Sequence, residues 1–158
     1  VWRAVSHLLQ GGSPVALSTT IAVLLIAVFA CLSLVHVYWL LGGRVGLLAA
    51  IPELDGKPVF QPSAVATLVV AIGLALCAVV IAGTAGVLTL PLSQTVLSWM
   101  TRGLATVLLL RAIGDFRLVG FFKHIHHTCF ARLDTAVYSP LCLVLALGTA
   151  IVGFAGSG

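Results

Sequence analysis

Four long apolar stretches, separated by segments rich in Gly, Pro or polar residues, dominate the chain. They lie at about residues 14–41, 63–88, 93–115 and 134–155. A membrane helix needs roughly 20 apolar residues, because each residue rises about 1.5 Å and the hydrocarbon core is about 30 Å thick. Each stretch reaches this length. The pattern therefore predicts an all-α membrane protein in which residues 1–158 form a single domain of four transmembrane helices.

Residues that favour helix starts set the expected limits. Residues 13–14 are Ser-Pro, a good N-cap followed by Pro at the first helical position, and the second and third helices are expected to begin near Ser63 and Ser93. Asp134 is expected to cap the fourth helix. A start at Pro140 would leave 16 residues, or about 24 Å, which is short for a span. Pro140 would then lie in the first turns and could bend the helix.

The segment between the third and fourth helices leaves two alternatives open. Its apolar residues recur at four- and three-residue steps, at Leu118, Phe122, Ile125, Cys129 and Leu133. Polar residues lie mostly between them, a pattern that suits an amphipathic helix in the membrane interface. The alternative is an irregular polar loop with scattered apolar anchors.

The composition agrees with a lipid environment. The chain is 61% hydrophobic and 8% charged, whereas a soluble domain carries about 25% charged residues. Its net charge of +4 is not gathered in a basic stripe with interleaved aromatic residues, so we expect no nucleic-acid partner. Basic residues that flank apolar spans report topology instead.

Their distribution predicts the orientation. Six basic residues belong to the side of the first and third loops, and two to the other side: Arg44, Lys57, Arg111, Arg117, Lys123 and Arg132 against Arg3 and Arg102. Because Lys and Arg accumulate on the cytoplasmic side, both long loops are expected in the cytoplasm and both termini outside it.

Small residues in the second helix favour close helix packing. They are Gly73, Ala78, Ala82 and Gly86. Lipid is as apolar as Leu, so helices associate through close contact or polar bonds, and small residues permit close contact. The third helix carries Arg102 near its middle. There a guanidinium either extends toward the nearer interface or lines a substrate or proton path.

Several polar and aromatic residues are expected at one depth, near the cytoplasmic boundary. They are His36, Tyr38, Trp39, Arg111, Asp115, Arg117, Asp134 and Tyr138. Arg can bind a phosphate or carboxylate through two parallel hydrogen bonds, and His can transfer a proton near neutral pH, so they could form a ligand pocket. The alternatives are an Arg111–Asp115 ion pair at i, i+4 and an interfacial belt of Trp and Tyr.

We expect neither a metal nor a cofactor. The spacing of His124, His126 and His127 matches no metal-binding pattern of membrane di-iron enzymes. The four cysteines form no Cys-x-x-Cys pair, which disfavours a quinone-linked disulfide enzyme. The chain also contains no nucleophile elbow, Walker loop or Gly-x-Gly-x-x-Gly motif.

Three strings, HVYWLLGGRVG, AAIPELDGKP and LLRAIGDFRLVGFFK…FARLDTAVYSPLC, resemble the bacterial family called domain of unknown function 3995. The resemblance covers about residues 20–150 and implies a small four-helix membrane protein in a bacterial inner membrane. It implies no activity and no catalytic residues.

The leading hypothesis is a protein that binds a lipid or amphiphile at the cytoplasmic end of the bundle. A second version is an accessory subunit that packs against a partner membrane subunit or forms a homo-oligomer. The alternative is a membrane enzyme acting on a quinone, isoprenoid or other lipid, with His36 or Asp115 as acid or base and Arg111 and Arg117 holding an anionic group.

The orientation is testable with reporter fusions at the C-terminus. Alkaline phosphatase, which is active only outside the cytoplasm, is expected to be active there, and green fluorescent protein is expected to be dark. The reverse pattern would overturn the assignment, because four spans and a C-terminus in the cytoplasm would place both long loops outside.

Overall fold

The computed structural model describes residues 14–54, 57–114, 119–124 and 128–156. Its elements are α2 (Pro14–Leu40), the 3₁₀ turn η1 (Leu48–Ala50), strands β1 (Glu53–Leu54) and β2 (Lys57–Pro58), α3 (Ala64–Thr84), α4 (Gln94–Ile113), α5 (Cys129–Leu133), the π-helical turn η2 (Asp134–Tyr138) and α6 (Ser139–Ala155). α5, η2 and α6 form one continuous helix, Cys129–Ala155.

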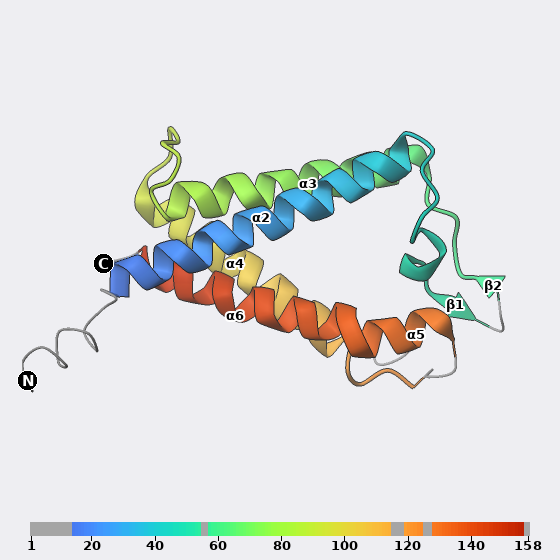
Figure 1. Ribbon diagram of the computed structural model, residues 1–158. Helices are drawn as coiled ribbons and strands as arrows, with labels where there is room; N and C mark the ends of the chain where they lie inside the picture. Colours follow the sequence, from blue (N-terminus) through green and yellow to red (C-terminus); the bar gives the residue numbers. More distant parts are fainter. Residues whose placement is uncertain (1–13, 55–56, 115–118, 125–127, 157–158) are drawn as a thin grey trace, which may run out of the picture.

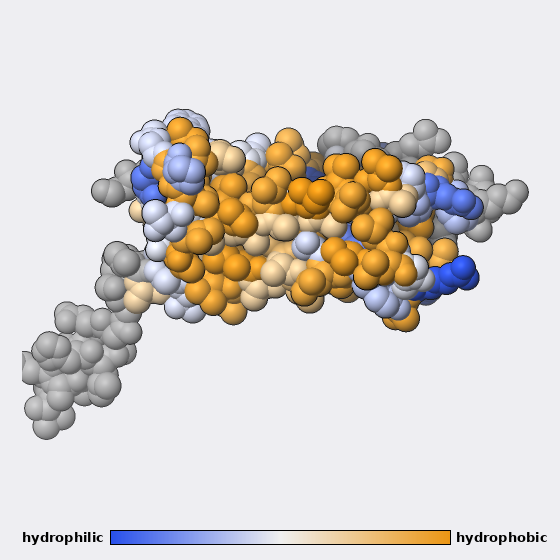
Figure 2. Space-filling view, turned by 90° about the horizontal axis from the view of Figure 1, so that it is seen from above, coloured by the Kyte–Doolittle hydropathy of each residue, from blue (hydrophilic) through white to orange (hydrophobic). Residues whose placement is uncertain are grey.

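Four of these helices are long and apolar enough to cross a membrane, so the prediction of an all-α fold with four membrane spans is confirmed. The strands form only a small antiparallel hairpin in the loop between α2 and α3, with Glu53 opposite Pro58. Figure 2 shows apolar residues over the middle of the visible face and polar residues gathered toward its two ends. This distribution suits a protein whose middle faces lipid.

The four helices pack as two pairs, α2 with α3 and α4 with α6 (Figure 1). The pairs lie close together where α2 begins and α6 ends, and they diverge toward η1 and the hairpin. The main core lies in the close half, where Phe29 and Ile81 are almost fully buried with Val152. Apolar packing therefore holds one end of the bundle, and the other end needs different contacts.

Local capping explains where two helices begin. The hydroxyl of Ser63 accepts a hydrogen bond from the backbone N–H of Ala66 at 3.1 Å, and that of Ser93 accepts one from Val96 at 3.4 Å. Each satisfies an N–H that has no partner within the first turn. The turn between α3 and α4 is held by a hydrogen bond of 2.7 Å between the hydroxyls of Thr84 and Thr101.

The expectation that Asp134 caps the fourth helix is wrong. The helix begins five residues earlier, at Cys129, and its N-cap is Thr128, whose hydroxyl accepts from Ala131 N–H at 3.1 Å. Asp134 lies inside the helix with its side chain fully buried. A hydroxyl at 128 is as good a cap as a carboxylate, and the carboxylate is engaged by tertiary partners.

Of the two alternatives for the segment between the third and fourth helices, the described residues 119–124 form turns and bends rather than an amphipathic helix. Cys129 and Leu133 belong to the start of the fourth helix instead. Gly114 and Gly120 adopt φ of +94° and +91°, which a right-handed helix does not allow. Their backbones touch, so a Cβ on either residue would overlap the other segment.

Candidate functional site

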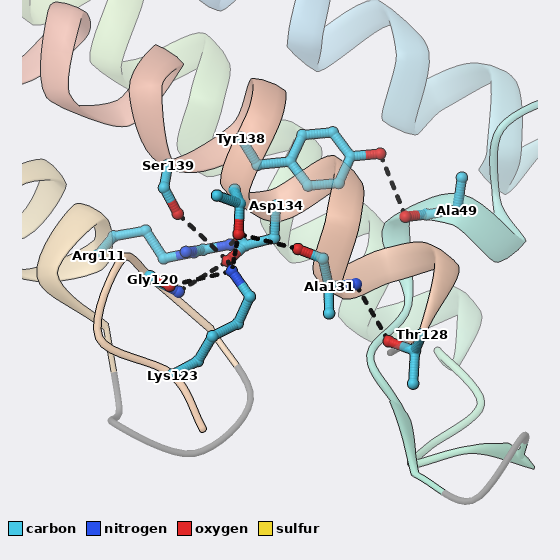
Figure 3. A network of polar contacts seen from close by, with 10 residues as sticks. Ala49, Arg111, Gly120, Lys123, Thr128, Ala131, Asp134, Tyr138 and Ser139 are labelled. Atoms are coloured by element: carbon cyan, nitrogen blue, oxygen red, sulfur yellow. Dashed lines mark hydrogen bonds and ion pairs between the residues drawn. The ribbon is translucent and has the colours of Figure 1, made fainter. Parts of the chain in front are cut away.

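The carboxylate of Asp134 organises the polar end of the bundle (Figure 3). Oδ1 accepts a hydrogen bond from Arg111 Nη2 at 2.8 Å. Oδ2 accepts from Lys123 Nζ at 2.9 Å, from Gly120 N–H at 2.8 Å and from Ser139 Oγ at 3.2 Å. We call these five residues the Asp134 cluster. Since the Asp134 side chain is 0% exposed, this set of donors replaces the water that would otherwise stabilise its charge.

Lys123 is buried as completely as its partner, with a side-chain exposure of 0%. Its ammonium has three donors, and all three are used: on Asp134, on the Gly120 carbonyl at 3.1 Å and on Thr135 Oγ1 at 2.6 Å. A buried ammonium is tolerated only when it is paired and fully hydrogen-bonded in this way. The sequence assigned Lys123 to the topology signal and to a basic interfacial segment, and it did not pair Lys123 with Asp134, because the two residues are 11 positions apart.

The π-helical turn η2 brings Ser139 to the carboxylate. Side chains five residues apart point about 140° away from each other in an α-helix. The wider turn, closed by the hydrogen bond from Ser139 N–H to the Asp134 carbonyl, reduces that angle. Pro140 follows directly and has no N–H to bond the carbonyl of residue 136, which favours an irregular turn at this point.

Arg111 is less enclosed than the other members of the cluster. Its side chain is 34% exposed, and its Nη1 atom is buried without a hydrogen-bond partner in the described part of the chain. The cluster contains two cations, Arg111 and Lys123, and one anion, Asp134, so its net charge is positive. Both carboxylate oxygens of Asp134 and all three ammonium donors of Lys123 have partners within the protein, which fits a structural junction better than an open catalytic centre.

A separate pocket of about 170 Å³ lies between the ends of α2 and α3 and the η1 loop. It is lined by His36, Trp39, Leu47, Ala50, Ile51, Phe60, Pro62, Ala66, Thr67 and Val70. We call it the His36 pocket. Among its described lining residues His36 is the one titratable side chain, and the rest of the wall is mostly apolar.

The hydrogen bond of His36 determines which ring nitrogen remains available. Nδ1 lies 2.8 Å from the carbonyl oxygen of Leu32. A carbonyl only accepts, so Nδ1 carries the proton and Nε2 of the neutral ring is an acceptor. The ring also packs edge-on against Trp39 at 4.9 Å between centroids, which holds its orientation. In its neutral form His36 therefore contributes one oriented hydrogen-bond acceptor to a largely apolar wall.

The structure divides the predicted pocket residues into separate groups. His36 and Trp39 line the His36 pocket, whereas Arg111 and Asp134 join the Asp134 cluster. Among the described residues, no hydrogen bond or ion pair links His36 to either of them. Tyr38 is exposed and packs over Gly43.

Tyr138 connects the two pairs of helices at their diverging end. Its hydroxyl donates to the carbonyl of Ala49 in η1 at 3.2 Å (Figure 3).

Two predicted site residues, Asp115 and Arg117, lie outside the described residues. The Arg111–Asp115 ion pair therefore stays a prediction.

The small residues of the second helix lie in different environments. Ala78 and Ala82 are buried within the chain's own bundle. Gly73 is partly exposed, and a Cβ there would meet nothing within 4 Å. Gly86 lies beyond the end of α3, in a turn with φ of +70°.

Arg102 contacts the fourth helix. Its Nε donates to the carbonyl of Gly153 at 3.1 Å, in the last turn of α6. Its guanidinium carbon lies 5.1 Å from the ring of Trp99, which is nearer the start of α4. The side chain thus extends toward the nearer end of the helix, as in the first of the two alternatives for Arg102.

No group of three or more His, Cys, Asp or Glu side chains in the described ranges is arranged to hold a metal ion. His126 and His127 lie outside those ranges. The four cysteines are free thiols.

A family model described as "Protein of unknown function (DUF3995)" matches residues 29–149, about three quarters of the chain. No curated protein and no solved structure matches the chain. The matched range includes the Asp134 cluster and the lining of the His36 pocket.

Replacing Asp134 tests the role of the cluster. Asp134→Asn removes the anion and leaves Lys123 buried without a counter-ion, which is expected to cost about 3–5 kcal/mol. The free energy of unfolding can be measured by titrating the purified protein in mild detergent with SDS and following helicity. The double variant Lys123→Met with Asp134→Asn should recover much of the loss. Unchanged resistance to SDS in Asp134→Asn would contradict this role.

Gly120 gives an independent test of the same junction. Gly120→Ala places a Cβ against the backbone of Ile113 and Gly114 at positive φ, and it should lower the free energy of unfolding by about 1–3 kcal/mol. Gly103→Ala is the matched control. A Cβ at this exposed helical site meets nothing within 4 Å, so stability should stay equal or rise by up to about 1 kcal/mol. Equal effects of both changes would contradict the tight packing at Gly120.

Proposed function

Because the chain belongs to the DUF3995 family of proteins of unknown function, its activity has to be inferred from its own residues, and we propose that it binds a lipid or amphiphile in the His36 pocket. The observation that carries this proposal is a mostly apolar pocket with one fixed polar acceptor, at the polar end of a membrane helix bundle. Such a pocket suits a molecule with an apolar body and a polar head.

The size of the pocket favours partial enclosure of the ligand. Sites that enclose a whole small molecule usually measure about 300–1,000 Å³. At about 170 Å³ the His36 pocket would hold only the part next to the head group. The chain of an amphiphile would continue along the helices into the bilayer, where it needs no protein cavity.

The lining suggests which head group is bound. Nε2 of the neutral His36 ring is an acceptor, so this form favours a head that donates a hydrogen bond, such as a hydroxyl. Trp39 is held in place by its own indole N–H, which donates to the carbonyl of Val45 at 2.9 Å. Thr67 is the further polar side chain in the wall. We therefore propose a hydroxyl-bearing lipid or isoprenoid rather than a purely anionic ligand.

The basic residues support a location in the cytoplasmic leaflet. Arg44, Arg111, Lys123 and Arg132 belong to the loops and helix ends at this end of the bundle. By the positive-inside rule this end faces the cytoplasm. We thus propose a protein of the bacterial inner membrane whose ligand enters from the inner leaflet and whose two termini lie outside.

Two other functions have weaker support. In an accessory subunit or a homo-oligomer, the small residues of α3 would receive the neighbouring helix, but Ala78 and Ala82 are already buried within this chain. For a lipid enzyme, His36 would need a second acid or base, and Asp134 is engaged by four donors. Asp115, the other candidate, lies outside the described residues.

Filling the pocket tests the proposal. Ala66 is exposed on α3 and lines the pocket, so Ala66→Phe should occupy it and reduce the co-purifying hydroxyl-bearing lipid at least fivefold. Ala75→Phe, at an exposed position of the same helix away from the pocket, is the matched control and should retain the lipid. The readout is native mass spectrometry of protein extracted in mild detergent. The same bound lipids in both variants and the wild type would refute the proposal.

A further inference from the structure

A second feature is a groove of about 200 Å³ between α4 and α6, which runs from Arg102 along the middle of α4. It is lined by Arg102, Ala105, Thr106, Leu109, Ala146, Leu147, Ala150 and Phe154. Four of these, Thr106, Leu109, Leu147 and Phe154, are exposed, so the groove opens toward the surrounding lipid. We call it the Arg102 groove.

The groove has a charged end and an apolar body. Arg102 and Phe154 lie at one end, and Leu109 and Leu147 follow along the two antiparallel helices. The seven residues from Arg102 to Leu109 rise about 10 Å, which is the length of several methylene groups. The Thr106 hydroxyl donates to the Arg102 carbonyl at 3.0 Å and is therefore occupied within its own helix.

The guanidinium of Arg102 is positioned but not neutralised. Its Nε caps α6 through the Gly153 carbonyl, and its carbon lies 4.5 Å from the ring of Phe154 and 5.1 Å from that of Trp99. Its Nη1 and Nη2 make no hydrogen bond within the described part of the chain, and the ion pairs found there belong to Asp134. The two terminal nitrogens thus remain as donors beside a lipid-facing groove.

The depth of Arg102 favours a further partner for its guanidinium. It lies eight residues into α4, about 12 Å from the start of that helix. A cation at such a depth is costly unless it meets protein, water or a lipid head group. The aromatic rings supply part of the compensation, and an anion in contact with both terminal nitrogens would supply the rest.

We propose that the Arg102 groove binds an anionic glycerophospholipid from the leaflet at the start of α4. The phosphate accepts hydrogen bonds from Nη1 and Nη2 of Arg102, and one acyl chain lies along the small side chains of Ala105, Ala146 and Ala150. Trp99, which is 65% exposed, then lies near the head groups, as interfacial Trp does. This site is separate from the His36 pocket in position, leaflet and head-group chemistry.

The test is a lipid titration of the full chain in mild detergent, followed by native mass spectrometry. Phosphatidylglycerol and phosphatidylcholine with identical acyl chains are the probes, and the wild type is expected to prefer the anionic lipid. Arg102→Gln should weaken phosphatidylglycerol binding at least fivefold and remove the preference. Arg132→Gln changes the net charge equally at an exposed position of the opposite end, and it should keep the wild-type preference.

Arg102→Gln also removes the hydrogen bond to Gly153 in α6 and could unfold the protein, so a second variant alters the groove and leaves Arg102 in place. Ala150→Leu fills the groove at a partly exposed position and keeps Arg102. It should therefore weaken the binding of both lipids at least threefold, while the helicity of the protein stays unchanged. Equal losses in Arg102→Gln and Arg132→Gln would overturn the proposal, as would unaltered binding in Ala150→Leu. Displacement of the lipid by inorganic phosphate at equal concentration would also overturn it, because the site would then recognise a free anion.

Discussion

The burial of one carboxylate is the constraint on which the polar end of this protein depends. Asp134 is fully enclosed, and its charge is stable there only if donors replace the lost water. Those donors come from α4, from the loop after it and from the start of α6, through Arg111, Lys123 with Gly120, and Ser139. Without Lys123 the buried pair would be broken, and without Arg111, Gly120 or Ser139 the carboxylate would lose one of its donors, so the three segments stabilise one another.

This constraint complements the way in which the rest of the bundle is held. Lipid provides no hydrophobic drive for helices to associate, so close packing and polar bonds have to do so. At one end the packing of Phe29, Ile81 and Val152 brings the two helix pairs together. At the other end the pairs diverge, and Tyr138 connects them through a hydrogen bond to Ala49. The polar end can therefore leave a pocket open beside His36 without loss of the core.

The two proposed lipid sites differ in the chemistry that they offer. The His36 pocket presents an acceptor on an apolar wall, while the Arg102 groove presents a cation with two unpaired nitrogens. They lie between different helices, the His36 pocket beside α2 and α3 and the Arg102 groove between α4 and α6. A lipid bound at Arg102 would be a structural partner of the bundle, whereas the ligand of the His36 pocket would define the function.

The sequence by itself determined the four spans, because apolar length and capping are local properties and Ser63 and Ser93 act within one turn of their own helices. It also predicts that His36, Arg111 and Asp134 lie near one depth, since expected depth follows from residue count. It missed Lys123 as the partner of Asp134, because that contact crosses a loop whose path depends on Gly114 and Gly120. Which side chains meet at a given depth depends on the rotation and divergence of the helices. The tertiary structure alone decided this, and it separated His36 from Arg111 and Asp134.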